Sequence, residues 1–220
     1  PVGISTFKDI IAGEFLYVDK TQYIYELVRY PKGVYFLARP RRFGKSLLIS
    51  TLNALFAGQR DLFAGLWIHD SDYQWEEYPV IRIDFSQVKV ATAAELKSAI
   101  VEYLDRIAQQ HQLSLTGSTY YFRFSDLIRQ LATRNQVVVL VDEYDKPLID
   151  NLGDIAEARR IREVLKGFYT ILKGTDEYLR FVFLTGVSKF SKVGVFSDLN
   201  NLKDITMDNR FATMLGVTPE

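Results

Sequence analysis

The sequence predicts a three-layer α/β/α fold around a mostly parallel central sheet, and three observations lead to it. Short runs of Val, Ile, Leu and aromatic residues have the length of strands, at 34–38, 80–85, 137–141 and 181–186. Between these runs apolar residues recur at helical spacing, as at Leu96, Ile100, Leu104 and Ile107. Strands that alternate with helices of this length need crossover connections, which favour a parallel sheet buried on both faces.

Composition limits the possible functions. The 220 residues are 48% apolar, and 27 basic residues balance 27 acidic ones, so no overall field attracts nucleic acid or an anionic membrane. There is no cysteine, which excludes disulfides and thiolate metal sites, and His69 and His111 stand apart from other metal-ligating residues. With no long apolar span and no N-terminal targeting pattern, we expect a cytoplasmic protein without a membrane partner or a direct nucleic-acid signal.

The two ends of the chain suggest its domain organisation. Residues 5–13 predict a short helix closed by Gly13, and residues 21–31 predict a second helix that Pro31 ends. We assign 1–32 to an N-terminal extension and 33–220 to a nucleotide-binding core, which together form one domain. At the other end, residues 218–220 have the N-cap, Pro and Glu of a new helix, so we expect a fragment of a longer protein.

The segment after the first strand resembles a phosphate-binding loop. In G-x-x-x-x-G-K-[ST] (Walker A), backbone N–H groups and a helix N-terminus surround the phosphates, the Lys reaches the terminal phosphates and the hydroxyl binds Mg2+. Gly44, Lys45 and Ser46 fill the last three places, whereas Arg39 replaces the first Gly and cannot copy its backbone freedom. The cations of this segment could simply be solvated on a surface turn. Their position at the carboxyl end of a strand favours a nucleotide site instead.

We therefore predict that one continuous segment contacts the nucleotide. Its residues are Arg39, Pro40, Arg41, Arg42, Phe43, Gly44, Lys45, Ser46 and Leu47. Planar guanidinium groups suit phosphate oxygens, so Arg41 and Arg42 are expected to compensate partly for the missing Gly.

An acidic pair follows the third apolar run. Asp142 is predicted to hold Mg2+ together with Ser46, and Glu143 to orient or deprotonate the attacking water (Walker B). A helix cap or a surface turn would also explain two adjacent acids. One strand, 80–85, lies between the two motifs in the chain, as in the P-loop ATPases that insert a strand and carry an Asp-Glu pair.

Thr185 and Ser188, at the end of the next strand, are candidates to sense the terminal phosphate. A hydroxyl that satisfies the backbone at a strand end is an equally good interpretation.

Five segments in succession resemble one family, the predicted AAA-ATPase-like proteins of bacteria and archaea, over essentially the whole chain. They are YVDKT (17–21), RPRRFGKSLL (39–48), LVDEYDKP (140–147), LTGVSKFSK (184–192) and FSDLNNLKDIT (196–206). The resemblance implies that Lys45 and Ser46 are the phosphate-loop Lys and Mg2+ ligand, and that Asp142 and Glu143 are the acidic pair. Members share the Arg at the first-Gly position, and they often carry a C-terminal domain similar to PD-(D/E)xK nucleases.

Three smaller features of the sequence leave more than one interpretation open. The YVDKT segment could lie on the adenine side or start a helix with Asp19 or Thr21 as cap. Asp145 and Lys146 could bridge to the phosphate loop or form an ordinary salt bridge. Arg180 and Arg210 are candidates for an arginine finger, which would imply a homo-oligomer if a neighbouring subunit supplied it.

The predicted function is Mg2+-dependent ATP hydrolysis that drives a conformational change in a larger protein, with ATP and Mg2+ as cofactors. The alternative is a nucleotide-binding switch or interaction module with little or no hydrolysis.

Overall fold

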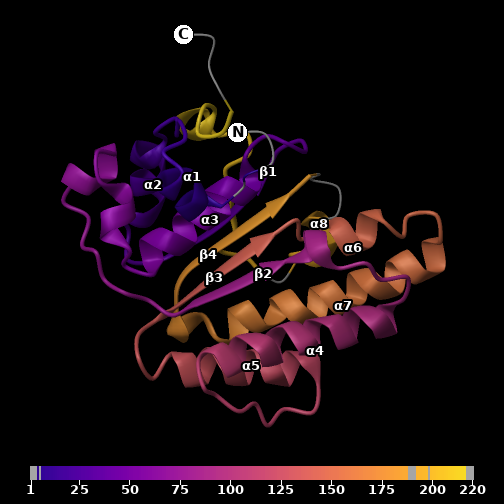
Figure 1. Cartoon of the computed structure of the whole chain (residues 1–220). Coiled ribbons are helices and arrows are strands. Elements are labelled where there is room, and N and C mark those ends of the chain that lie inside the picture. Colours follow the sequence, from indigo (N-terminus) through magenta and orange to yellow (C-terminus); the bar gives the residue numbers. More distant parts are fainter. Residues whose placement is uncertain (1–3, 5, 188–191, 198, 217–220) are drawn as a thin grey trace.

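A computed structural model describes residues 4, 6–187, 192–197 and 199–216 (Figure 1). Its centre is a five-stranded sheet in the order β2-β3-β4-β1-β5, and every pair in it is parallel. The strands are β1 (Gly33–Ala38), β2 (Val80–Asp84), β3 (Val137–Asp142), β4 (Leu179–Gly186) and β5 (Lys203–Asp204). The predicted parallel sheet is therefore confirmed, with a short fifth strand that the sequence did not reveal.

Strand order differs from chain order at one important place. β4 lies between β1 and β3 in the sheet, with Phe36 beside Leu184 and Leu140 beside Phe183. β2, which lies between the two motifs in the chain, is the edge strand of the sheet. Its one neighbour among the described strands is β3, which follows it in the chain after α4 and α5. The strand that separates the phosphate-loop strand from the acidic strand is thus β4.

Three helices cover one face of the sheet (Figure 1). They are α1 (Phe7–Ala12), α2 (Thr21–Val28) and α3 (Lys45–Phe56). Phe7, Ile24 and Leu52 pack in the same core as Leu140 and Phe183 of the sheet. The predicted N-terminal extension therefore shares its hydrophobic core with the sheet and α3.

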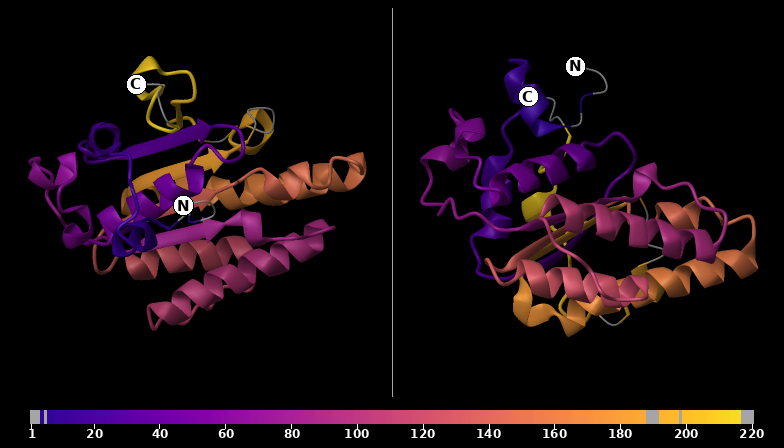
Figure 2. Two further views of the ribbon diagram at one scale, coloured as in Figure 1. Left: turned by 45° about the horizontal axis from the view of Figure 1, so that its top comes forward. Right: turned by 60° about the horizontal axis from the view of Figure 1, so that its bottom comes forward.

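The opposite face carries three further helices (Figure 2). They are α4 (Ala93–Gln110), α5 (Tyr120–Leu131) and α7 (Ile155–Gly174), with the single-turn helices α6 (Lys146–Ile149) and α8 (Lys192–Val195) nearby. The apolar stripe predicted from Leu96, Ile100 and Leu104 is buried here. Both faces of the sheet are covered, which confirms the three-layer architecture.

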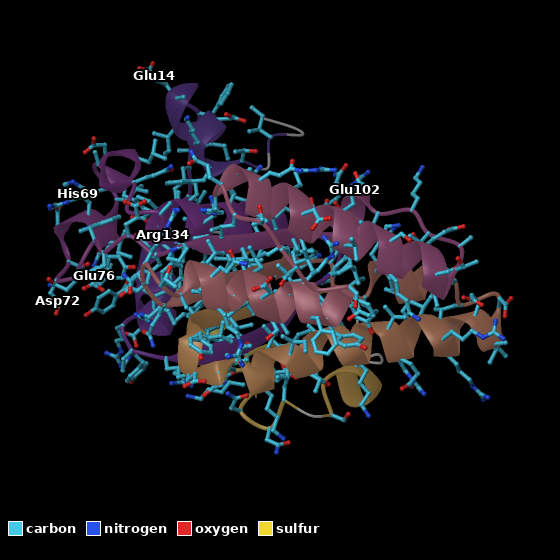
Figure 3. All side chains as sticks on the ribbon, turned by 90° about the horizontal axis from the view of Figure 1, so that it is seen from below. Glu14, His69, Asp72, Glu76, Glu102 and Arg134 are labelled. Atoms are coloured by element: carbon cyan, nitrogen blue, oxygen red, sulfur yellow. The ribbon has the colours of Figure 1, made fainter. Side chains whose placement is uncertain are left out.

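The remaining connections contain short 3-10 turns. They are η1 (Arg60–Phe63), η2 (Trp67–Asp70), η3 (Phe85–Gln87), η4 (Asp176–Tyr178) and η5 (Asn209–Phe211). Segment 57–79 carries His69, Asp72 and Glu76 along the outer edge of the molecule (Figure 3). His69 pairs through Nδ1 with Asp70 at 3.0 Å.

No helix in the described part of the chain is both long and apolar enough to cross a membrane. The helix predicted to begin at Thr218 lies outside the described residues, as does Ser188.

Candidate functional site

The phosphate-loop segment curls at the carboxyl end of β1 and leads directly into α3. Gly44 has φ 87° and immediately precedes α3, which begins at Lys45. Arg42 also has positive φ, at 65°, although it is not glycine. A left-handed backbone costs a non-glycine residue about 1–2 kcal/mol, so the loop conformation is held by its surroundings. The N–H groups of the first turn of α3 have no acceptor within the helix, and they lie next to this exposed loop. Helix starts of this kind bind anions.

Lys45 is the buried cation of this loop. Its side chain is folded inward, leaving the residue 4% exposed, and Nζ donates to the carbonyls of Arg39 and Pro40 at 2.9 Å each. Burial lowers the pKa of Lys45, while the nearby charges of Glu143 and Asp142 act in the opposite direction. An ammonium group that is partly desolvated and held only by neutral carbonyls can exchange them for an anionic ligand.

The acidic pair lies at the end of β3, and Thr185 of β4 fixes its position. Asp142 is fully buried, and its Oδ1 accepts the Thr185 hydroxyl at 2.5 Å. The same hydroxyl oxygen accepts the backbone N–H of Glu143 at 3.2 Å, and the Thr185 carbonyl accepts that of Tyr144 at 2.9 Å. Since the Thr185 proton is already donated to Asp142, this conformation favours a positioning role over contact with a phosphate. Phosphate sensing by Thr185 stays a prediction.

Glu143 projects from a strained backbone position. Its φ is 51°, and the side chain is half-buried. Burial raises the pKa of Glu143 and the neighbouring Asp142 raises it further, against the opposing charges of Lys45 and Arg41. A carboxylate with a raised pKa is a better proton acceptor than an ordinary surface Glu.

Asp145 binds Val187, the residue that follows β4. It is fully buried, and both carboxylate oxygens accept the Val187 backbone N–H, at 3.3 and 3.1 Å. A Cβ at Gly186 would lie 2.3 Å from the Tyr144 ring, so only glycine allows this close approach. Lys146 forms an ion pair with Asp150, which confirms the salt-bridge interpretation for the Lys.

Arg39, at the first-Gly position, turns towards the C-terminal segment. Its Nη1 donates to the Thr206 carbonyl at 2.6 Å and to the Ala38 carbonyl at 3.0 Å. The Thr206 hydroxyl accepts the Ala38 N–H at 3.0 Å. These bonds join the start of the phosphate loop to the residues after β5, a link that the sequence analysis missed because the fifth strand is only two residues long.

The two arginine-finger candidates lie in very different places. Arg180 is at the amino end of β4, the opposite edge of the sheet, and its guanidinium donates to the carbonyls of Val28 and Tyr30 at 2.7 and 2.8 Å. It is 8% exposed and lies at the opposite ends of the strands from the two motifs, so within this subunit it does not face the predicted phosphate site. Arg210 is exposed and pairs with Asp208 at 2.6 Å.

A carboxylate that the sequence analysis overlooked stands beside the acidic pair. Asp84 ends β2 and lies in register with Asp142, so both side chains leave the sheet on the same face. It is half-buried, and its Oδ1 accepts the Ser86 N–H at 2.8 Å. After burial and Asp142, the charge of Asp84 also contributes to the raised pKa of Glu143. The available signal was an acid ending an apolar strand, as at Asp142.

Asp19, in the YVDKT segment, stabilises the start of α2. Its Oδ1 accepts the backbone N–H and the hydroxyl of Thr21, the first residue of α2, at 2.8 and 2.7 Å. Its other oxygen accepts the Trp67 N–H at 2.7 Å, which ties α2 to η2. The helix-entry interpretation is therefore supported, but neither predicted residue is the cap itself, because the N-cap of α2 is Lys20 and Thr21 is its first helical residue. The adenine-side interpretation stays a prediction.

The chemistry of the donors fits Mg2+. In the described structure Asp142 Oδ2 is buried and has no hydrogen-bond partner, so one carboxylate oxygen is available beside Lys45. Mg2+ typically takes one or two protein ligands and completes its shell with phosphate and water, so a cluster of three acids or histidines is not required. The described residues contain no such cluster. Ser46, in the first turn of α3, is the second residue that could hold the ion.

With the loop, the acidic pair and the sheet order defined, comparison with known proteins is decisive. The family model described as predicted AAA-ATPase matches residues 1–196. The chain belongs to this predicted AAA-ATPase family. The family description indicates nucleotide binding. A relative from Azotobacter chroococcum mcd 1, described as an uncharacterized protein in the vnfD 5' region, is 46% identical over 223 residues. The match covers 99% of this predicted AAA-ATPase chain and 43% of that relative's length.

Proposed function

We propose that this member of the predicted AAA-ATPase family binds ATP with Mg2+ and hydrolyses it. One observation carries the proposal, which is the meeting of two motifs about a hundred residues apart. Lys45 lies at the start of α3, and the charges of Asp142 and Glu143 act directly on its ammonium group. Buried opposite charges grouped around an exposed helix start suit a triphosphate better than they suit a structural role.

The binding step uses the loop and Lys45. Backbone N–H groups around Gly44 and the start of α3 would surround the phosphate oxygens. Lys45 would leave the carbonyls of Arg39 and Pro40 for the terminal phosphates, where the acceptor as well as the donor is charged. Arg41 and Arg42 are exposed on the loop and would add donors. Arg39, in contrast, would act through its bond to Thr206.

The hydrolytic step uses Glu143. It would orient a water for in-line attack on the γ-phosphorus and accept its proton, while the bond between the γ-phosphorus and the β–γ bridging oxygen breaks and ADP leaves. Ser46 and Asp142 would hold a Mg2+ ion, which would supply charge neutralisation at the phosphates. Thr185 would keep Asp142 and the backbone of Glu143 in position through its two hydrogen bonds.

The second candidate is a nucleotide-dependent switch with little or no hydrolysis. The bonds from Arg39 and Ala38 to Thr206 favour it, because they connect the phosphate loop mechanically to the C-terminal segment. A homo-oligomer, an attached nuclease-like domain and a cytoplasmic location stay predictions from the sequence.

Phosphate release from MgATP tests the proposal, with Glu143→Gln as the diagnostic variant. We expect the variant to retain nucleotide binding and to release phosphate at least about 100-fold more slowly, because the proton acceptor is lost. Glu163→Gln, an exposed substitution on α7, is the matched control. Tight binding of ATP without turnover in the wild type would favour the switch, and the absence of nucleotide binding would end both candidates.

A further inference from the structure

The side chain of Asp145 does not serve the helix that it precedes. Asp145 is the N-cap residue of α6, a position that favours Asp because its carboxylate can accept an N–H of the first helical turn. Asp145 makes no such bond to α6. Both of its oxygens accept the Val187 N–H instead, across 42 positions of the chain. A side chain that forgoes its local partner in this way is expected where tertiary structure or function requires it elsewhere.

The turn that contains Asp145 also holds the backbone of Glu143. The Lys146 N–H donates to the Glu143 carbonyl at 3.0 Å, which closes a turn of four residues. Asp145 is the third residue of this turn, and its φ of −94° and ψ of −5° are the values usual at that position. Glu143 and Asp145 therefore belong to one closed unit, so an anchor on the Asp145 side chain restrains the position of Glu143.

Three successive residues join this turn to the carboxyl end of β4. The Glu143 N–H donates to the Thr185 hydroxyl oxygen at 3.2 Å, and the Tyr144 N–H donates to the Thr185 carbonyl at 2.9 Å. Asp145 adds the third connection through Val187, at 3.3 and 3.1 Å. Of these three connections only the last is made by a side chain of the turn. It is therefore the one that a substitution in the turn can remove while both backbone bonds keep their donors and acceptors.

We propose that Asp145 is a positioning residue for hydrolysis, an inference that rests on the function proposed above. Glu143 has φ 51°, a left-handed conformation that a non-glycine residue keeps only where its surroundings hold it. Asp145 is fully buried, and a carboxylate acceptor makes a stronger bond to an N–H than a neutral acceptor does. A displaced proton acceptor lowers the rate of reaction much more than it lowers substrate affinity. Asp145 therefore acts on turnover, through Glu143.

Two variants of the whole chain separate this role from helix capping. Asp145→Ser keeps a good N-cap residue but is too short and has too few oxygens to hold Val187 as Asp does. Asp145→Asn keeps the length and one acceptor oxygen. In phosphate release from MgATP we expect kcat to fall about 30-fold in the Ser variant and about fivefold in the Asn variant. KM and MgATP affinity should stay within about twofold, because the charge of Asp145 acts on Lys45 less than those of Glu143 and Asp142 do.

Hydrogen exchange provides a readout that does not depend on the reaction. In the Ser variant without nucleotide, the backbone amides of Glu143, Tyr144 and Val187 should exchange at least about tenfold faster, because the turn is no longer anchored to β4. Amides in the middle of β3 should keep their wild-type exchange rates. Asp150→Asn is the matched control, since it removes a carboxylate at the other end of α6 that pairs with Lys146. It should change neither kcat nor the exchange of the turn.

The possible failures are distinguishable. Wild-type kcat in the Ser variant, or unchanged exchange at Glu143 and Tyr144, would overturn the positioning role and leave the proposed function intact. Faster exchange throughout the sheet, with kcat and MgATP affinity reduced together, would show that Asp145 only stabilises the fold, and it would also overturn the proposal. A wild type that binds MgATP but releases no phosphate would overturn the proposed hydrolysis, and this inference with it.

Discussion

Two buried cations lie at opposite edges of one sheet, Lys45 at the carboxyl edge and Arg180 at the amino edge, and both donate to two backbone carbonyls. Their surroundings differ. Aromatic rings enclose Arg180, whose guanidinium lies 5.8 Å from the Phe56 ring and 5.6 Å from the Tyr78 ring. Around Lys45 there are instead carboxylates, an exposed loop and strained backbone. Burial of a cation alone does not define a functional site, because the groups around it decide whether its partners can be exchanged.

The largest expected effect is a loss of stability when Arg180, the cation at the amino ends of the strands, is replaced. Arg180→Ala removes the donor to the carbonyls of Val28 and Tyr30 and the cation over two rings, so it should lower the free energy of unfolding by about 2–4 kcal/mol. Urea unfolding measures this, and Arg180→Lys should recover only part of the loss, because an ammonium lacks the planar fork. ATP affinity of the folded variant should equal that of the wild type. A large affinity loss would break the comparison.

Lys45→Ala should have the opposite profile. Loss of a charge-assisted contact to the phosphates should weaken MgATP binding by about 50- to 100-fold. Stability should not fall, since burial lowers the pKa of Lys45 and the charged ammonium therefore opposes folding at neutral pH. Binding and urea unfolding are measured on the same preparation. A clear drop in stability at unchanged affinity would show that Lys45 is structural like Arg180.

A smaller effect is expected from the exposed cations of the loop. Replacing Arg41 and Arg42 together by Ala should weaken MgATP binding about five- to tenfold, because each contributes a solvent-exposed charge contact. The loss should shrink at high salt. The matched control replaces Arg159 and Arg160, exposed on α7, in the same way. Unchanged affinity would show that these side chains do not compensate for the missing glycine.

The smallest expected effect is on the pH dependence of stability, and it concerns one buried tyrosine near each of the two cations. Burial raises the pKa of Tyr17, near the loop, to about 12, and it also raises the pKa of Tyr73, near Arg180. Both contribute stability that is complete below about pH 10 and is lost as the pH rises further, because the unfolded chain ionises first. Tyr17→Phe and Tyr73→Phe should each make stability decline less between pH 9 and 11. Urea unfolding at several pH values measures the slopes, and slopes equal to that of the wild type would contradict these shifts.

Sequence patterns were sufficient for the parts of the molecule that depend on local periodicity. The strand-length apolar runs and helical spacing predicted the layers, because burial on both faces imposes a continuous run on a parallel strand. The segment at Gly44, Lys45 and Ser46 and the pair at Asp142 and Glu143 were predicted as one site. They meet because the carboxyl ends of parallel strands share an edge.

The partners of long or hydroxylated side chains could be decided only by the tertiary structure. Arg39 bonds to Thr206 and Arg180 bonds to Val28, contacts that join residues more than 150 positions apart. Thr185 binds Asp142 because β4 lies between β1 and β3, an order that no local pattern encodes. The sequence by itself therefore determined the elements and the chemistry of the two motifs. Only the tertiary structure decided which side chains meet at the predicted site, because the order of the strands sets the distance between residues that are far apart in the chain.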